Sequence, residues 1–289
     1  GSSPIVPGPW RALQHRLNDT DGFFELSELP ESIAMIGLGV IGLELGQALA
    51  RLGVKINVFT LDKRLGGLSS PKLQDYALEL FRSELPIAVT GVDKLEERDG
   101  KLIVEAGGEE LAVDKAFLAM GRRPNIAGLG LEEIGAAMNG PMPVFDGGTY
   151  RLGDLPIYLP GDANAHRPVL HEAADEGRIA GYNAVRDKDQ CFRRRTALAI
   201  TFSDPNIASL GSSYEQLVAD GIDFVTGEVS YEGQGRAIVK LENKGILQVY
   251  AERQSGRLLG AELIAPEGEH LAHLLSWAVA GGLNAQDAL

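Results

Sequence analysis

The chain has 289 residues, of which 44% are hydrophobic, enough for about two domains with sizeable cores. Its 40 acidic and 27 basic residues give a net charge of −13, which disfavours nucleic acid and anionic membranes as partners. No apolar run approaches the ~20 residues of a membrane helix and no signal peptide is apparent, so a cytoplasmic protein is expected. The single cysteine, Cys191, excludes an internal disulfide, and no metal site is predicted.

Residues 1–25 are expected to be rich in loops, with three aromatic side chains, Trp10, Phe23 and Phe24, serving as packing residues. A strand over residues 33–36, a helix over 43–52 and a second strand over 54–60 follow. These elements form a βαβ unit, and a glycine-rich turn joins the first strand to the helix.

This turn has the pattern G-x-G-x-x-G, with glycines at Gly37, Gly39 and Gly42. Gly37 lets the chain leave the strand sharply, Gly39 has no side chain to block a pyrophosphate, and Gly42 lets the helix lie close to the strand. The free N–H groups of the first helical turn, at Val40 and Ile41, would then face the anion. The pattern predicts a dinucleotide site, and the alternative is a glycine-rich turn without a ligand.

The identity of the coenzyme stays open at the end of the second strand. A carboxylate there would select NAD by accepting a hydrogen bond from the ribose 2′-hydroxyl. Thr60 occupies that position, and Asp62 follows closely enough to reach the hydroxyl. Lys63 and Arg64 could instead hold the 2′-phosphate of NADP.

After a polar loop, a helix is expected from Pro71, with a buried apolar stripe that ends at Phe81. Short strands then form a meander and return the chain to the main sheet; they are expected over residues 87–90, 93–98, 101–106, 110–113 and 115–120. This arrangement predicts a three-layer nucleotide-binding domain.

The next segment, residues 126–153, is rich in glycine and proline and is expected to be an extended excursion. A strand from Leu155 then ends at Gly161 and Asp162, and a helix follows over 168–185. An acid between a strand and a helix commonly holds a sugar hydroxyl, although Asp162 as a simple turn or cap residue is the alternative.

The last part of the chain is expected to be an α+β domain with a mostly antiparallel sheet. Its strands are predicted over residues 197–202, 207–211, 223–230, 236–241, 246–251 and 258–265, and its helices over 213–220 and 268–280. His270 and His273 on the last helix have no third ligand at metal-binding spacing, so they are interpreted as an ordinary helix face.

Four motifs, in this order, resemble those of the flavoprotein pyridine nucleotide–disulfide oxidoreductases, in the branch of dihydrolipoamide dehydrogenase and mercuric reductase. They span residues 37–46, 119–125, 157–162 and 202–208, and Met120 stands where the family's second motif has threonine. The resemblance implies NAD or NADP and FAD as cofactors and a homodimer. It places Gly121 and Arg122 in a cofactor-binding motif, Asp162 at the FAD ribityl chain, and Glu44 near the flavin where the nicotinamide docks.

The resemblance also implies a domain order: a link from the FAD domain (residues 1–23), an NAD(P) domain (24–123), a further FAD-domain segment (124–192) and a dimerisation domain (193–289). The family's N-terminal FAD half with its redox cysteines, and its C-terminal His–Glu pair, have no counterpart here. The chain alone is therefore expected to be incomplete for turnover and to hold FAD weakly or not at all.

The implied reaction passes hydride between NAD(H) and FAD and then electrons to a disulfide, with NAD favoured by the resemblance. One alternative is a nucleotide-binding and oligomerisation module without turnover. Another is a related enzyme, such as mercuric reductase or soluble pyridine nucleotide transhydrogenase. A self-sufficient Rossmann dehydrogenase is disfavoured because no Ser/Tyr/Lys or His/Asp set is placed for a substrate.

Overall fold

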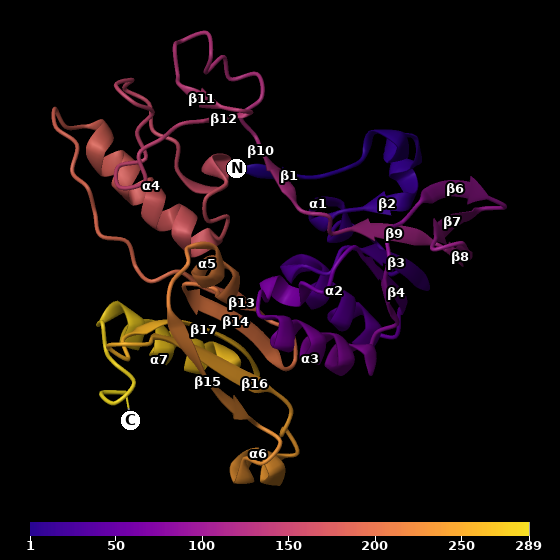
Figure 1. Ribbon diagram of the computed structural model, residues 1–289. Coiled ribbons are helices and arrows are strands. Elements are labelled where there is room, and N and C mark those ends of the chain that lie inside the picture. Colours follow the sequence, from indigo (N-terminus) through magenta and orange to yellow (C-terminus); the bar gives the residue numbers. More distant parts are fainter. Residues whose placement is uncertain (289) are drawn as a thin grey trace. The chain divides into compact units, whose positions relative to one another are not determined.

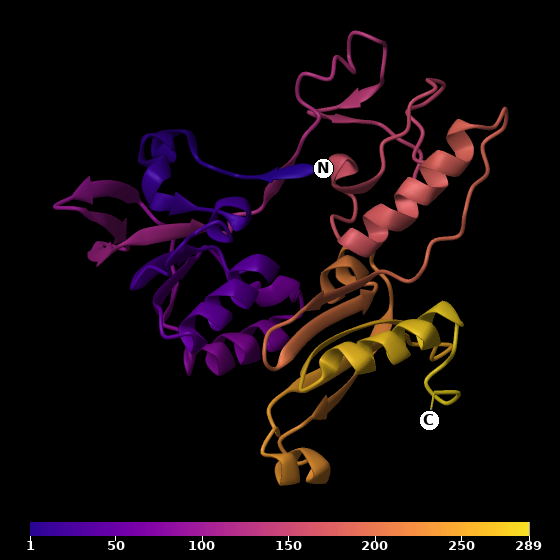
Figure 2. The same cartoon turned by 180° about the vertical axis from the view of Figure 1, so that it is seen from behind.

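The computed structural model describes residues 1–288, which form two compact units (Figures 1 and 2). Unit 1 contains Gly1–Ile5 and Arg122–Arg195, and unit 2 contains Val6–Gly121 and the chain from Thr196 onward. Among residues 1–288, every helix is too short or too polar to span a bilayer.

Unit 2 begins with a five-stranded parallel sheet in the order β2-β9-β3-β4-β5. Its strands are β2 (Leu17–Asn18), β3 (Ser32–Ile36), β4 (Lys55–Thr60), β5 (Ile87–Val89) and β9 (Lys115–Leu118). Two helices connect successive strands: α2 (Val40–Arg51) lies between β3 and β4, and α3 (Pro71–Arg82) lies between β4 and β5. This is the predicted βαβ architecture.

Three layers follow from the alternation of side chains along β3. Ile33 and Met35 belong to the core that α2 and α3 share with the sheet, whereas Ala34 and Ile36 belong to a second core on the opposite face. Leu102 and Val104 of the meander complete that second core. The meander strands are β6 (Lys94–Arg98), β7 (Lys101–Ala106) and β8 (Glu109–Val113). The predicted three-layer domain with a meander is confirmed.

The first residues of unit 2 are more ordered than expected. They form the 3₁₀ helix η1 (Gly8–Arg16) and the short helix α1 (Thr20–Phe23), which Asp19 caps by accepting from two backbone N–H groups. Phe23 is buried edge-to-face against Phe117. Phe24 is 73% exposed, so its predicted role as a packing residue is wrong. Adjacent helical residues lie about 100° apart, and only Phe23 faces the core.

The remaining part of unit 2 is an antiparallel sheet in the order β13-β14-β17-β16-β15. Its strands are β13 (Leu198–Thr201), β14 (Asn206–Gly211), β15 (Phe224–Ser230), β16 (Ile246–Glu252) and β17 (Leu258–Ala265). Helix α7 (Gly268–Ala280), the yellow helix in Figure 2, lies against β14 and β17. Ala272 and Leu275 are its residues in the core of this sheet. The α+β prediction for this region is confirmed.

The strand predicted over residues 236–241 is wrong, because this segment is the helix α6 (Gly235–Lys240) at the tip of the β15–β16 hairpin (Figure 1). The Gln234 side chain caps the helix by accepting from the Ala237 N–H. This cap satisfies a backbone N–H of the first helical turn and so favours the helix over a strand. The short helix α5 (Tyr214–Ala219) agrees with its prediction.

Unit 1 pairs the start of the chain with a distant segment: β1 (Ser2–Pro4) is antiparallel to β10 (Arg122–Pro124). A small hairpin, β11 (Met138–Asn139) and β12 (Met142–Pro143), then precedes the 3₁₀ helix η3 (Gly161–Asn164) and helix α4 (Leu170–Ala184). The strand predicted from Leu155 is wrong, because only one bridge, between Arg151 and Tyr158, forms there. Pro156 and Pro160 lack the N–H groups that a ladder requires.

Candidate coenzyme site

The turn after β3 contains three glycines with different surroundings. Gly37 has φ +99°, and a Cβ there would lie 2.3 Å from the carbonyl oxygen of Ala119. A Cβ on Gly42 would lie 2.1 Å from the carbonyl oxygen of Gly37. No atom lies within 4 Å of the Cβ position at Gly39. Gly37 and Gly42 are therefore required by packing within the protein, whereas Gly39 presents bare backbone to open space.

A cavity of about 460 Å³ lies beside the turn, within the size range of small-molecule sites. Four of its lining residues lie at or just after the carboxyl ends of parallel strands: Ile36, Thr60, Thr90 and Ala119. Ligands of open parallel sheets bind at this edge. The cavity therefore occupies the position expected for a nucleotide.

The first turn of α2 follows directly after Gly39, which lines this cavity. The helix begins after Gly39, and no side chain caps its N-terminus. The first N–H groups of a helix have no partner within it, and together with the helix dipole they favour an anion. Val40 and Ile41 lie in this turn. These residues fit the diphosphate of a dinucleotide, which would lie against the bare backbone at Gly39.

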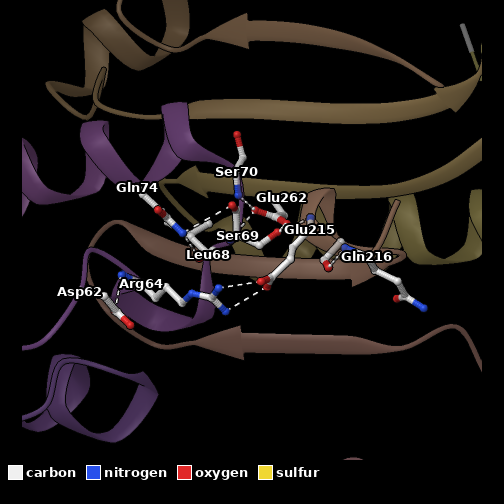
Figure 3. A network of polar contacts seen from close by, with 10 residues as sticks. Asp62, Arg64, Leu68, Ser69, Ser70, Gln74, Glu215, Gln216 and Glu262 are labelled. Atoms are coloured by element: carbon white, nitrogen blue, oxygen red, sulfur yellow. Dashed lines mark hydrogen bonds and ion pairs between the residues drawn. The ribbon is translucent and has the colours of Figure 1, made fainter. Parts of the chain in front are cut away.

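The loop after β4 is shaped by its own polar groups. The Thr60 hydroxyl donates to the carbonyl oxygen of Asp62 at 3.1 Å, and the Asp62 carboxylate accepts from the Arg64 N–H at 2.9 Å. Thr60, Asp62 and Arg64 all line the cavity. Arg64 also forms a two-pronged ion pair with Glu215 of α5, and these hydrogen bonds raise the pKa of its guanidinium (Figure 3).

A buried carboxylate holds the next part of the same loop. Glu262, on β17, accepts from the N–H groups of Ser69 and Ser70 at 2.9 Å each and also from the Ser69 hydroxyl. It further accepts from the N–H of Tyr214 at 3.0 Å, at the start of α5. Figure 3 shows Glu262 beside Ser69 and Ser70. One side chain thus joins the coenzyme loop to the helix that carries Glu215.

Glu44, predicted from the resemblance to lie near a flavin, is on the second turn of α2. One of its carboxylate oxygens accepts from the Phe202 N–H at 2.7 Å. The neighbouring Gln47 side chain accepts from the Asp204 N–H at 2.7 Å and donates to its carbonyl oxygen at 2.9 Å. Both residues therefore hold the segment between β13 and β14.

The predicted flavin-contacting residues lie in unit 1. Arg122 donates from Nε to the Ser2 hydroxyl at 2.9 Å, and this hydroxyl donates to the Asp162 carboxylate at 2.7 Å. Gly161 has φ +72°, but its N–H is already bonded to the buried Glu176. Of this motif, the Asp162 carboxylate is thus the group that fits a sugar-like hydroxyl of FAD.

The structure therefore divides the predicted site residues into groups. Those that line one cavity are Gly37, Gly39, Thr60, Asp62 and Arg64, and those in the adjacent helical turn are Val40, Ile41 and Gly42. Gly121, with φ +95°, ends a segment of unit 2, and Arg122, Gly161 and Asp162 belong to unit 1.

Sequence analysis missed several residues at this site. The cavity is also lined by Pro7 and Trp10 of the opening segment and by the Thr90–Val92 loop. Glu215 and Glu262 were missed as well, because each contacts a loop more than 140 residues away, as the separations of 151 and 193 show. No local pattern of residues marks such contacts.

Comparison with known families decides the identity of the fold. The family model for pyridine nucleotide-disulphide oxidoreductases matches residues 1–177, more than half of the chain. The chain belongs to this family. The model for the dimerisation domain of these oxidoreductases matches residues 198–289. The oxidoreductase family uses FAD and NAD(P), so the predicted resemblance, cofactors and fold class are confirmed at the level of the family.

Individual relatives of this chain agree with the family assignment. The dihydrolipoyl dehydrogenase of Geobacillus stearothermophilus is 28% identical over 99% of this chain and 62% of its own length. The mercuric reductase of Acidithiobacillus ferrooxidans is 30% identical over 99% of this chain and 52% of its own. The HOCl-induced flavoprotein disulfide reductase RclA of Escherichia coli has the same fold, with a TM-score of 0.84, 22% identity and coverage of 98% of this chain and 66% of that one. The chain thus spans between half and two thirds of these relatives.

Proposed function

We propose that this chain carries the nicotinamide-nucleotide-binding and dimerisation functions of an FAD-dependent disulfide oxidoreductase, most like dihydrolipoyl dehydrogenase. In this proposal the coenzyme supplies or accepts hydride, and electrons pass by way of FAD to a disulfide. Residues 24–123 would bind NAD(P), residues 124–192 would contribute to the FAD site, and residues 193–289 would form the dimer; the segment 1–23 would link the first two. Gly161 and Asp162 would lie at the flavin, and Glu44 would lie near the flavin where the nicotinamide docks.

The observation that carries this proposal is the contrast among the three glycines of the turn. A Cβ at Gly37 or Gly42 would meet protein backbone, whereas a Cβ at Gly39 would meet nothing. Packing therefore explains the first two glycines and does not explain the third. A diphosphate that approaches the main chain would require Gly39 to lack a side chain.

Titration with NADH and NADPH, followed by nicotinamide fluorescence, tests the proposal. We expect saturable binding that Gly39→Val abolishes without changing the urea unfolding midpoint. Gly235→Val is the control at another helix N-terminus: Gly235 is the first residue of α6, and none of the described atoms lies within 4 Å of its Cβ position. Absence of saturable binding by the unchanged protein, or normal binding by Gly39→Val, would contradict the proposal.

A module that binds nucleotide without turnover is the second candidate function. It is favoured by the single cysteine, Cys191, because a redox disulfide requires two sulfur atoms. NADH-dependent reduction of lipoamide or of a dye by this chain distinguishes the candidates. Sustained turnover would exclude the module, and binding without turnover would support it.

A homodimer is proposed through the C-terminal sheet domain. Its support is the match to the family's dimerisation domain and two exposed apolar side chains on α7, Leu274 and Trp277. We expect Trp277→Glu to lower the mass measured by light scattering from dimer towards monomer, and Val239→Glu, on α6, to leave it unchanged. A cytoplasmic location stays a prediction of the sequence.

A further inference from the structure

The cationic side chains of the coenzyme loop are already engaged. Arg64 donates from its two terminal nitrogens to the two carboxylate oxygens of Glu215, at 2.9 and 2.6 Å (Figure 3). Lys63 donates to Asp75 at 2.7 Å. These are the two side chains that could bind the 2′-phosphate of NADP. In this structure, both are paired with carboxylates of the protein instead.

The Arg64–Glu215 pair has the geometry that would compete most directly with a phosphate. A planar guanidinium binds a carboxylate or a phosphate through the same two parallel hydrogen bonds. Glu215 therefore occupies the Nη1/Nη2 edge of Arg64, one of the two guanidinium edges on which a 2′-phosphate could bind. It also adds a negative charge next to Arg64, which itself lines the cavity.

The position of Glu215 is fixed by the buried network around Glu262. The Glu215 N–H donates to the Ser69 hydroxyl at 3.1 Å, and this hydroxyl is bonded to Glu262. Because Glu262 also accepts from the Tyr214 N–H, it holds both ends of the arrangement: the coenzyme loop and the start of α5. The backbone of Glu215 is thus placed by the fold, within reach of Arg64 for its carboxylate.

We propose that Glu215, in the dimerisation domain, favours NAD(H) over NADP(H) by occupying Arg64, and that Glu262 is the positioning residue for this pair. The inference rests on the proposed function, because it assumes that the adenosine ribose lies beside Thr60 and Asp62. Asp62 is then left to accept from the 2′-hydroxyl of NAD. A residue outside the nucleotide domain thereby takes part in the choice of coenzyme.

The expected effect is moderate, because both side chains are about half exposed, 53% for Arg64 and 54% for Glu215. An exposed ion pair shifts an equilibrium by up to about fivefold. Glu215→Gln should therefore tighten NADPH binding by roughly three- to fivefold and leave the dissociation constant of NADH unchanged. The gain should shrink as salt is added, because the released guanidinium and the phosphate are screened.

The test is a double-mutant cycle on the dissociation constants of NADH and NADPH, measured by nicotinamide fluorescence at low and high salt. The variants are Glu215→Gln, Arg64→Gln and both together. Asp223→Asn is the matched control, because it removes a carboxylate from another exposed ion pair of the same domain, with Arg253. We expect tighter NADPH binding with Glu215→Gln alone and no such gain in the Arg64→Gln background.

The outcomes separate this inference from the proposed function. Saturable binding of the coenzymes with an unchanged NADH-to-NADPH ratio in Glu215→Gln would overturn the inference and leave the proposed function standing. An equal gain in Asp223→Asn, or a gain that persists without Arg64, would overturn it too, since the cause would be net charge. No binding of either coenzyme would overturn both.

Discussion

Two fully buried glutamates, Glu262 in unit 2 and Glu176 in unit 1, differ in the number of hydrogen bonds that their carboxylates accept. In unit 2, Glu262 receives four hydrogen bonds, two on each oxygen. In unit 1, Glu176 receives two, from Gly161 and the Asn164 side chain, and both reach the same oxygen. Its other oxygen is buried and, among residues 1–288, has no partner.

Other buried polar atoms without a hydrogen bond within residues 1–288 occur in both units: Arg194 Nε in unit 1 and Glu269 Oε2 in unit 2. Arg167 Nη1, also in unit 1, has no hydrogen bond but lies 3.5 Å from Glu172 Oε1 in an ion pair. Buried polar groups are normally paired. The contrast between the two units thus lies in these two glutamates: both oxygens of Glu262 are hydrogen-bonded within unit 2, whereas one oxygen of Glu176 has no hydrogen bond within residues 1–288.

The largest predicted effect concerns Gly37, in unit 2. Gly37→Ala should destabilise the protein by about 3–5 kcal/mol, because it combines backbone strain with overlap against the Ala119 carbonyl. Gly153→Ala, in unit 1, is the control for strain alone: φ is +53° and nothing lies near its Cβ position. Urea unfolding measures the loss of stability in both variants. Equal losses would show that the close approach to the Ala119 carbonyl does not contribute to the cost of Gly37→Ala.

Glu262→Gln should cost about 2–4 kcal/mol. The amide group would direct donors at backbone N–H groups that are themselves donors, and these would stay buried without acceptors. Chemical unfolding at neutral pH measures the loss. A change below 0.5 kcal/mol, roughly the level of a surface substitution, would show that this network is not what holds the coenzyme loop.

Glu176→Gln is the matched change in unit 1 and should alter stability by less than about 1 kcal/mol, or increase it. One amide oxygen can still accept from Gly161 and Asn164, and the buried charge is removed. If Glu176→Gln were as costly as Glu262→Gln, the proposed contrast between the two units would be wrong.

An effect smaller than that of Glu262→Gln is expected at Asp114, which joins the start of β3 to the end of β8. The hydrogen bond from Lys101, with those from Ser32, holds the pKa of Asp114 below its ordinary value despite partial burial. Its stabilisation, about 1–2 kcal/mol, is therefore present above the unfolded pKa of about 3.9 and is lost as the pH falls through the lower folded pKa. The free energies of unfolding of Asp114→Asn and of the unchanged protein should converge as the pH is lowered from 7 to 3. A constant difference between them would contradict this prediction.

The sequence predicted elements well where a strong periodicity lies between clear turn residues. Strand β17 and helix α7 begin and end as expected, and so does β7 after the turn at Asp99 and Gly100. Predictions failed where a local cap decided between alternatives, as in α6, whose first turn is capped by the Gln234 side chain. The glycine turn could be interpreted from spacing alone. The Arg64–Glu215 pair could not, because it depends on two segments that meet only in the fold.

The central claim is that a coenzyme diphosphate lies against the main chain at Gly39, and hydrogen–deuterium exchange with and without NADH tests it most directly. We predict that saturating NADH slows exchange in the peptide that covers residues 38–43. Exchange in the peptide around Gly235, which begins the short helix α6, should not change. Unchanged exchange over residues 38–43, under conditions where NADH binding is saturated, would contradict the account.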